Sequence, residues 1–475
     1  MTTLLYWYRI VHYLAICIIG SIYVTSNGSQ KATSLVDALS SSANQNRPFT
    51  WPPHSGYHGK PSFGNRNNNN AFFEGWYLRI ITESQGSLAL IFHIFDPHPT
   101  DSERRGVGCQ VVTPFGTFRQ ESKDVSSFRA ASHKLDIRYD FSKPQNQTAH
   151  VRTSFRDFFR LDVDKASGKI TSPEADVEFD FGVRPEVGWG TIERQYSVAG
   201  FLASFPVFEP HYQVLLSRGK VPAGGFLKVV QTHCKLAEPP NNLTTTNATK
   251  TTLYNLTDAT LYLEKNWGGS FPSQWFWIQA NTFVPGNEQP TSSSSSSSSY
   301  LDLCVTSTGA FRRLPLFGST EQEEQVALIA LHWKGEFFPF PQVDWSIEWG
   351  NWVVRGAYGG YLVELIGTCS EEEGLPVSCP TDQGMQEISM ETFRGTLRVK
   401  LFQKGDGEKS GRIVLDAVDP HACLEIGGLP WSDRTWVGKS AMKEPIKSVA
   451  MNVELEEKAS DFLKLVSNFI EIPGL

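Results

Sequence analysis

The sequence lacks the common motifs for nucleotide, metal and serine-nucleophile chemistry. Its 475 residues contain no G-x-x-x-x-G-K-[S/T] phosphate loop, no strand–G-x-G-x-x-G–helix unit, no G-x-S-x-G turn and no H-E-x-x-H. The glycine pairs in "WGGS" and "IGGLP" stand alone and are typical of tight turns. We therefore predict no cofactor and no metal site, which leaves a cofactor-free reaction or a protein that binds without catalysis.

Cysteine pairs and excess positive charge are also absent. The seven cysteines are scattered, with no C-x-x-C and no Cys/His cluster of zinc spacing, and an odd count argues against a disulfide framework. Cys369 and Cys379 could close a small loop, but such pairs are rare outside oxidising compartments. The net charge is −7, and no stripe of Lys and Arg stands out. A nucleic-acid partner is therefore not expected.

No apolar run in the chain reaches the length of a membrane-spanning helix. The nearest, residues 13–24, follows Arg9 and His12 and is typical of a signal-peptide core. The stretch up to about Arg47 is rich in Ser, Thr, Ala and Asn, with Asp37 as its only acid, as in transit peptides. We predict a cleaved leader over residues 1–50 with a two-part address, as for plastids entered through the secretory route. A single secretory signal followed by a flexible linker is the alternative.

Aromatic residues and two-residue alternation dominate the remainder of the chain. It holds 13 Trp, 14 Tyr and 31 Phe, and "LDIRYDF" (135–141), "VEFDF" (177–181) and "TLRVKLF" (396–402) alternate apolar with polar residues. This pattern is the signature of antiparallel sheets with one polar face. One short helix is predicted near the C-terminus, over 451–470, where apolar residues share one face. The fold class is therefore all-β.

Three polar insertions divide the chain. They lie at 65–70 (Asn-rich), 238–257 (Asn/Thr-rich, with three N-x-T sequons) and 292–299 (eight serines). We take 238–257 as the linker between two β domains, 51–237 and 258–475. Aromatic sheets of this kind close into sandwiches or barrels, and a barrel with an apolar mouth holds a hydrophobic ligand.

Candidate functional residues gather where acids and histidines sit among aromatic rings. Four segments do this: "PPHSGYH", "FFEGWYLRI", "GWGTIERQYSVAGFLASFPVFEPHYQVLLSRG" and "YLEKNWGGSFPSQWFWIQ". Each also has an ordinary structural explanation. Glu74 can be a buried acid paired with Arg79 or another base, and the Trp275–Trp277 run can be core packing.

These segments, together with the tail "LEIGGLPW…TWVGK…IPGL", closely resemble the tocopherol cyclase family, plastid enzymes of vitamin E synthesis. The resemblance runs in order from about Pro52 to Leu475. A weaker one reaches the carotenoid hydratases and AttH-like proteins, through "FFEGWY" and "YLEKNWG…WFWIQ". That group is built from two lipocalin-like antiparallel β-barrels, so the resemblance implies two such barrels here. The hydratases place their acid in a Y-x-D motif, which falls on Tyr262-Leu263-Glu264; this chain has Glu in place of Asp.

The resemblance implies closure of a chromanol ring in a prenylated methyl-quinol. The reaction protonates the prenyl double bond while the phenol oxygen attacks the tertiary carbon, and it is redox-neutral. We expect Glu264 to be the general acid, held neutral by its dry surroundings, and Tyr262 to orient it. Glu74 is the second candidate acid, or a like-charged partner that keeps Glu264 protonated.

Seven further residues complete the predicted site. The aromatic residues expected to contact substrate or cation, and the histidines proposed as bases for the quinol hydroxyl, are Trp76, Trp267, Trp275, Trp277, His54, His58 and His211. The predicted partner is a small prenylquinol, with peripheral docking on plastid lipid bodies or plastoglobules. Two alternatives stay open: a non-catalytic isoprenoid-binding protein and a hydratase that adds water to another isoprenoid alkene.

Overall fold

The alternating segments of the sequence form antiparallel strands. The structure is a computed structural model that describes residues 48–59, 72–96, 105–141, 157–198, 210–231, 249–269, 271–286, 300–314, 322–381, 384–405, 411–428 and 435–440. Within these ranges there are 26 strands and no α-helix, and no helix there has the length and apolar character needed to cross a membrane. The described residues from Phe49 onward belong to one compact unit.

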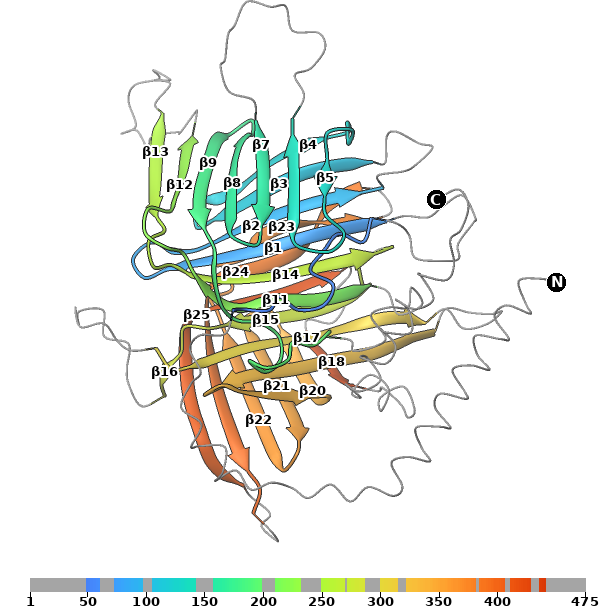
Figure 1. The fold of residues 1–475 in the computed structure, drawn as a ribbon. Coiled ribbons are helices and arrows are strands. Elements are labelled where there is room, and N and C mark those ends of the chain that lie inside the picture. The colour runs from blue at the N-terminus through green and yellow to red at the C-terminus, as the bar shows by residue number, and fades with distance from the viewer. Residues whose placement is uncertain are drawn as a thin grey trace, which may run out of the picture. The chain divides into compact units, whose positions relative to one another are not determined.

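The strands form three sheets (Figure 1). In spatial order, sheet 1 holds β10 (Arg184–Val187), β11 (His211–Lys220), β14 (Thr260–Gly268), β1 (Phe73–Thr82), β2 (Gly86–Phe95), β3 (Gly106–Thr113) and β4 (Gly116–Ser122). Sheet 2 holds β13 (Lys250–Asn255), β12 (Phe226–Gln231), β9 (Ala175–Gly182), β8 (Lys165–Thr171), β7 (Phe158–Asp162), β6 (Asp136–Asp140) and β5 (Arg129–Ala130).

Sheet 3 is the largest. Its path runs through β19 (Glu336–Phe340), β18 (Gln322–Trp333), β17 (Leu303–Leu314), β15 (Gln274–Ala280), β25 (Arg412–Gly428), β24 (Gly384–Gln403), β22 (Tyr361–Thr368), β21 (Asn351–Tyr358), β20 (Gln342–Glu348) and β26 (Thr435–Lys439). Off this path, β16 (Val284–Pro285) pairs with β25 and β23 (Leu375–Thr381) pairs with β24.

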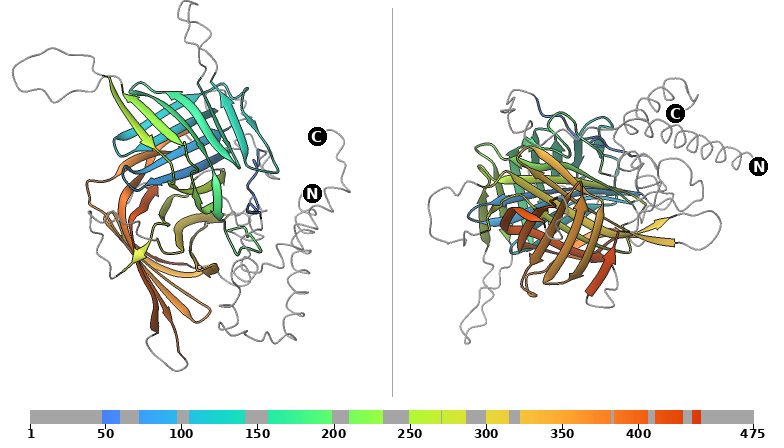
Figure 2. Two further views of the ribbon diagram at one scale, coloured as in Figure 1. Left: turned by 60° about the vertical axis from the view of Figure 1, so that its left-hand side comes forward. Right: turned by 90° about the horizontal axis from the view of Figure 1, so that it is seen from below.

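Sheet 1 lies between the other two sheets (Figures 1 and 2). One of its faces packs on sheet 2, where Trp76 and Leu263 share a buried core with Phe179. Its other face packs on sheet 3, where Tyr262 shares a buried cluster with Trp277 and Cys423. A separate core is made entirely by residues of sheet 3 and its connections. Side chains of neighbouring residues on β1 and β14 therefore enter two different environments.

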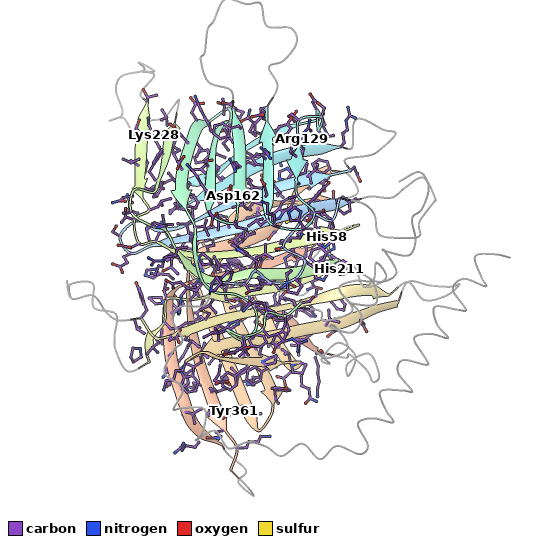
Figure 3. The ribbon with its side chains drawn as sticks, in the orientation of Figure 1. His58, Arg129, Asp162, His211, Lys228 and Tyr361 are labelled. Atoms are coloured by element: carbon purple, nitrogen blue, oxygen red, sulfur yellow. The ribbon has the colours of Figure 1, made fainter. Side chains whose placement is uncertain are left out.

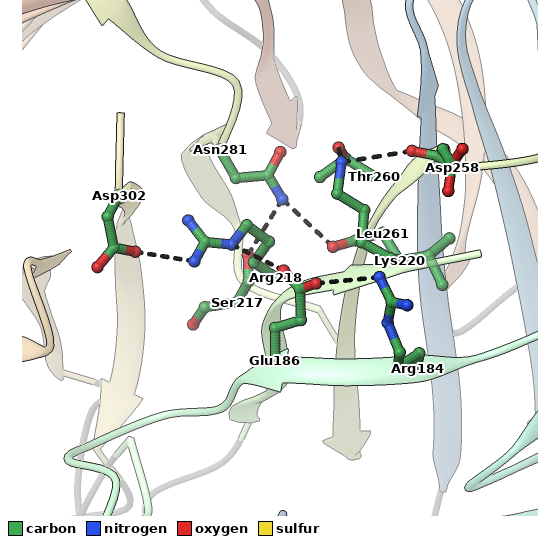
Figure 4. A network of polar contacts seen from close by, with 10 residues as sticks. All are labelled: Arg184, Glu186, Ser217, Arg218, Lys220, Asp258, Thr260, Leu261, Asn281 and Asp302. Carbon is green, nitrogen blue, oxygen red and sulfur yellow. Dashed lines mark hydrogen bonds and ion pairs between the residues drawn. The ribbon is translucent and has the colours of Figure 1, made fainter. Parts of the chain in front are cut away.

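A polar network joins sheet 1 to the strands of sheet 3 (Figure 4). The Arg218 guanidinium on β11 bonds Asp302 at 2.8 Å and Glu186 at 3.2 Å. The side-chain amide of Asn281, just after β15, donates to the backbone oxygens of Ser217 and Leu261. These bonds fix the start of sheet 3 against β11 and β14, the strands on which the candidate site is built.

The all-β prediction is confirmed, and the three alternating segments lie in β6, β9 and β24. Along β9 the residues alternate as predicted: Val177, Phe179 and Phe181 are buried. The two-barrel arrangement stays a prediction, and the predicted helix over 451–470 and most of the predicted leader lie outside the described residues. Cys369 and Cys379 are both free thiols.

Strand pairing changes sheets later in the chain than the predicted linker. β13 lies at the end of the 238–257 insertion and pairs with β12 of sheet 2. β14 follows the insertion and pairs with β1 and β11 of sheet 1. The first strand of sheet 3 is β15. The domain division itself stays a prediction, but the residues up to Gly268 pair with the strands of the N-terminal half.

Candidate active site

Glu264 lies on β14, on the face of sheet 1 that packs against sheet 3. It is directly opposite Tyr77 of β1 in the strand register. Its side chain is 6% exposed. Since residues at alternate positions share a face, Tyr262 accompanies Glu264 toward sheet 3 while Lys265 points toward sheet 2.

Three donors hold the Glu264 carboxyl in place. Its Oε2 atom accepts hydrogen bonds from the Tyr262 hydroxyl at 2.7 Å and from the Trp277 indole N–H at 2.9 Å. Its Oε1 atom accepts a longer bond of 3.3 Å from the side-chain amide of Asn266. Tyr212 completes the group, since its hydroxyl lies 2.9 Å from that of Tyr262 and accepts from Trp277 at 3.2 Å. The sequence-predicted residues Glu264, Tyr262 and Trp277 are thus in direct contact.

Burial dominates the electrostatics of this carboxyl. Removal from water raises the pKa of Glu264 from 4.5 to about 7, and the nearby Glu425 carboxyl pushes it the same way, against the nearby hydroxyls of Tyr262 and Tyr212 and the Asn266 amide. A carboxyl with this pKa is present in both protonation states near pH 7. It can therefore give or accept a proton without a large cost.

A second buried carboxyl, Glu391 of β24, reaches the same cluster from sheet 3. Its Oε1 atom accepts hydrogen bonds from the Tyr77 hydroxyl and from the Cys423 thiol, the latter at 2.7 Å. The Tyr77 ring meets the Trp277 ring edge to face, with 5.3 Å between centroids. Tyr77 and Trp277 thus link the two acids.

Glu425 of β25 stands between Trp277 and Glu391 in the strand register. Its Oε1 atom accepts bonds from the Trp275 indole at 2.8 Å and from the Ser389 hydroxyl at 2.5 Å. Burial raises the pKa of Glu425, and its charge raises the pKa of both Glu264 and Glu391. Trp275, predicted as a substrate contact, is therefore placed as the hydrogen-bond partner of a third acid.

Glu391 and Glu425 are not among the site residues predicted from the sequence. The signal for Glu425 was visible, because "ACLEIGG" places one acid in an otherwise apolar strand. Glu391 lies in "ISMETF", which is less apolar and gave no comparable sign.

The remaining predicted residues lie on the opposite face of sheet 1. There the Glu74 carboxylate forms an ion pair with the Lys265 ammonium at 2.6 Å, and both side chains are fully buried. The backbone N–H of His58 donates to Glu74 at 2.9 Å. Burial alone would raise the pKa of Glu74, but Lys265 and His58 outweigh it and hold the pKa below its usual value. Glu74 is thus an ionised, paired carboxylate.

Three predicted histidines stack around Trp267 on this same side (Figure 3 labels two of them). The ring centroids of His58, His211 and His54 lie 4.1, 4.9 and 5.5 Å from that of Trp267. His54 adopts a positive φ of 62° and shares a 3.1 Å hydrogen bond with His58. Burial, then the charges of His58 and Lys265, lower the pKa of His54 to about 3, so its ring is neutral. Trp76 is buried beside this group, with Lys265 5.8 Å from its ring.

Glu74 is a buried acid paired with a base, as its structural explanation predicts. That base is Lys265, whereas the Arg79 guanidinium donates to the Gln279 side chain and to backbone oxygens. The acid that raises the pKa of Glu264 is Glu425, not Glu74. The reason is strand alternation: Glu74 points toward sheet 2, and Glu264 toward sheet 3.

Among the described residues, no group of three or more His, Cys, Asp or Glu side chains could hold a metal ion.

The fold and this geometry define an all-β protein with buried carboxyls set among aromatic rings. The Tocopherol cyclase-like family model matches residues 70–428, and the chain belongs to that family. It is 28% identical to the tocopherol cyclase, chloroplastic, of Zea mays, covering 89% of this chain and 86% of that protein. It is 27% identical to the probable tocopherol cyclase, chloroplastic, of Oryza sativa subsp. japonica, covering 84% and 82%.

Among solved structures, a putative AttH from Nitrosomonas europaea is 13% identical with a TM-score of 0.35, covering 79% of this chain and 99% of that one. The all-β fold follows from the strand pairing described above, not from this likeness.

Proposed function

We propose that this protein is a tocopherol cyclase that closes the chromanol ring of a prenylated methyl-quinol. Membership of the tocopherol cyclase-like family supports the activity. One observation supports the mechanism most: Glu264 is a buried carboxyl whose pKa is raised to about 7, and it sits among aromatic rings on one face of sheet 1. An unactivated alkene is a poor base, so its proton donor must be a carboxylic acid that stays neutral near pH 7.

In this proposal Glu264 is the general acid. Its proton goes to the prenyl double bond at the carbon that leaves a tertiary cation. The phenol oxygen attacks that cation, a C–O bond forms, and the phenolic proton leaves to a base. No electrons are gained or lost, so the proposed reaction needs no redox cofactor.

The aromatic residues around Glu264 position its carboxyl and stabilise the cation in this mechanism. Both donate to Oε2 of Glu264, which leaves Oε1, with its longer bond to Asn266, as the oxygen that carries the transferable proton. The faces of Trp277 and Tyr77 stabilise the developing cation, at about 1–2 kcal/mol for each well-placed, desolvated ring. Trp275 holds Glu425 and so acts on the site indirectly.

The residues on the face of sheet 1 that packs on sheet 2 take no part in the proposed reaction. Glu74, Lys265, His58 and His54 satisfy one another's polar groups in the core between sheets 1 and 2, and the His58 ring stacks on Trp267. We propose that this group, with His211 and Trp76, holds β1 and β14 in register rather than binding the quinol.

Incubation with a prenylated methyl-quinol, followed by mass spectrometry, tests the activity. A cyclase yields an isomer of unchanged mass, a hydratase yields a product heavier by one water, and a carrier returns the substrate unaltered. Quinols of different ring methylation, each with a phytyl or a geranylgeranyl tail, identify the preferred substrate. An Ala variant at Glu264 is the negative control. A water adduct or unaltered substrate from the wild type would refute the cyclase proposal.

We further propose that the protein works in plastids, since both similar proteins are described as chloroplastic. The apolar tail of the substrate favours peripheral docking on plastoglobules or plastid membranes. Fluorescent tagging at the C-terminus checks this location, and removal of residues 1–50 should abolish plastid import.

A further inference from the structure

Glu391 is a buried carboxyl in which one oxygen accepts hydrogen bonds and the other accepts none from the described residues. Its side chain is fully buried. Oε1 accepts from Tyr77 and Cys423, whereas Oε2 has no hydrogen-bond partner among the described residues. A buried acceptor without a donor is costly, at about 1–3 kcal/mol. Such an atom in a candidate active site calls for a donor supplied by a bound molecule.

Both oxygens of Glu264, by contrast, already accept hydrogen bonds. Its Oε2 already accepts from two donors and its Oε1 from a third. The polar end of a quinol carries hydroxyl groups, which are hydrogen-bond donors. Of these two carboxyls, Glu391 is therefore the one with an acceptor atom to offer such a hydroxyl.

The two acids are connected through one pair of aromatic rings. Tyr77 lies opposite Glu264 in the β1–β14 register and bonds Glu391, while Trp277 bonds Glu264 and touches Tyr77 edge to face. A substrate bound against these two rings would have its alkene toward Glu264 and its hydroxyl toward Glu391.

We propose that Glu391 is the general base of the cyclisation: its bare Oε2 binds the attacking quinol hydroxyl and takes that proton. This inference rests on the proposed function. Glu264 gives its proton to the alkene carbon, the phenol O–H bond breaks as the C–O bond forms, and the phenolic proton passes to Glu391. Glu264 ends ionised and Glu391 neutral, and proton exchange with solvent restores both. No oxidant or reductant takes part.

The surroundings of Glu391 suit a strong base. The ionisable groups that face it are Tyr77 and Arg79 from β1, Cys379 from β23, and Cys423 and Glu425 from β25. Burial and then Glu425 raise the pKa of Glu391 to about 8, against the hydrogen bonds of Cys423 and Tyr77 and the charge of Arg79. At pH 7 most of Glu391 is protonated, and its ionised form grows as the pH rises through about 8; that carboxylate, once formed, accepts a proton more readily than an ordinary one.

The pH profile of kcat tests this division of roles. Catalysis requires neutral Glu264 and ionised Glu391, so the rate peaks between about pH 7 and about pH 8 and falls on both sides. In Glu391→Gln we expect kcat to fall about 100-fold with little change in KM. In the wild type the rate falls at low pH because Glu391 becomes protonated, so the residual rate of Glu391→Gln should not fall as the pH is lowered. Glu391→Asp, which keeps a carboxylate, should recover part of kcat and again show a low-pH limb, at a pH displaced from that of the wild type. Glu364→Gln, a surface change in an exposed pair with Arg355, is the control.

Each outcome decides the proposal. A Glu391→Gln variant with wild-type kcat, or with an unchanged low-pH limb, overturns it. If that variant does not fold, Glu391→Asp decides: a displaced low-pH limb supports the base, and an unchanged limb overturns it. A wild-type protein that makes no isomer at all refutes the proposed function, and this inference with it. Wild-type cyclisation with an insensitive Glu391 refutes the inference alone.

Discussion

The raised pKa of Glu264 predicts that replacing this acid by its neutral amide stabilises the protein at alkaline pH. The pKa of Glu264 is raised from 4.5 to about 7 by burial. Because the folded state binds this proton more tightly than the unfolded state, the stability that the group contributes is fully present below about pH 4.5 and is lost as the pH rises through about 7. The gap between the two pKa values, at about 1.4 kcal/mol for each unit, amounts to about 3 kcal/mol.

Glu264→Gln removes this pH dependence while keeping the shape of the side chain. The amide oxygen still accepts from Tyr262 and Trp277, and the Asn266 amide can turn its oxygen toward the new N–H₂ group. Relative to wild type, the variant should therefore gain about 3 kcal/mol of unfolding free energy as the pH rises from about 4.5 to about 7, and keep that gain at higher pH. It should at the same time lose cyclisation.

Denaturant titrations at a series of pH values measure this gain. The difference between the two stability curves reports Glu264 together with its coupling to Glu425, since the groups that do not interact with Glu264 titrate alike in both proteins. Glu364→Gln, in an exposed pair with Arg355, should cost at most about 1 kcal/mol and serves as the control. Parallel curves for wild type and Glu264→Gln would show that the acid is not held neutral by the fold, which refutes the reasoning.

Three further variants have defined outcomes. Glu74→Gln leaves the Lys265 ammonium buried without a counter-charge, so we expect a loss of about 3–5 kcal/mol in the free energy of unfolding by denaturant titration. Tyr262→Phe removes a hydrogen bond that lowers the pKa of Glu264, so the high-pH limb of kcat should move to higher pH and kcat should fall about fivefold. Glu425→Gln removes a like charge that raises the pKa of Glu264 and Glu391, so the pH optimum of kcat should move to lower pH.

Each of these variants can contradict the account. A Glu74→Gln protein as stable as the Glu364→Gln control would mean that the buried pair is unimportant for the fold. If the pH dependence of kcat is the same in Tyr262→Phe as in the wild type, Glu264 does not take part in the chemical step. An unmoved optimum in Glu425→Gln would mean that the three acids do not interact.

Sequence reasoning reached the fold class because the information it needed is local. In β9 the alternation of Val177, Phe179 and Phe181 with Glu178 and Asp180 is read directly from neighbouring letters. Glu264 could be proposed for a similar reason, as an acid placed between Tyr262 and the Trp275–Trp277 run, at the position of the hydratases' Y-x-D acid.

The rest of the site depends on contacts that neighbouring letters do not encode. The hydrogen bond between Tyr77 and Glu391 joins residues 314 positions apart. Lys265 pairs with Glu74 because β14 lies antiparallel beside β1, and only the register of those strands selects it over Arg79. The separation of the predicted site residues onto two faces follows from this pairing and from the packing of sheet 1 between two other sheets.

The most direct test of the account is cyclisation of a prenylated methyl-quinol in D₂O. If a buried acid protonates the alkene, the chromanol formed by the wild type carries one deuterium bound to carbon, which remains after exchange back into ordinary water. Glu264→Gln should form no such product. A chromanol without carbon-bound deuterium, or a deuterated chromanol made equally fast by Glu264→Gln, would contradict the central claim that Glu264 delivers the proton.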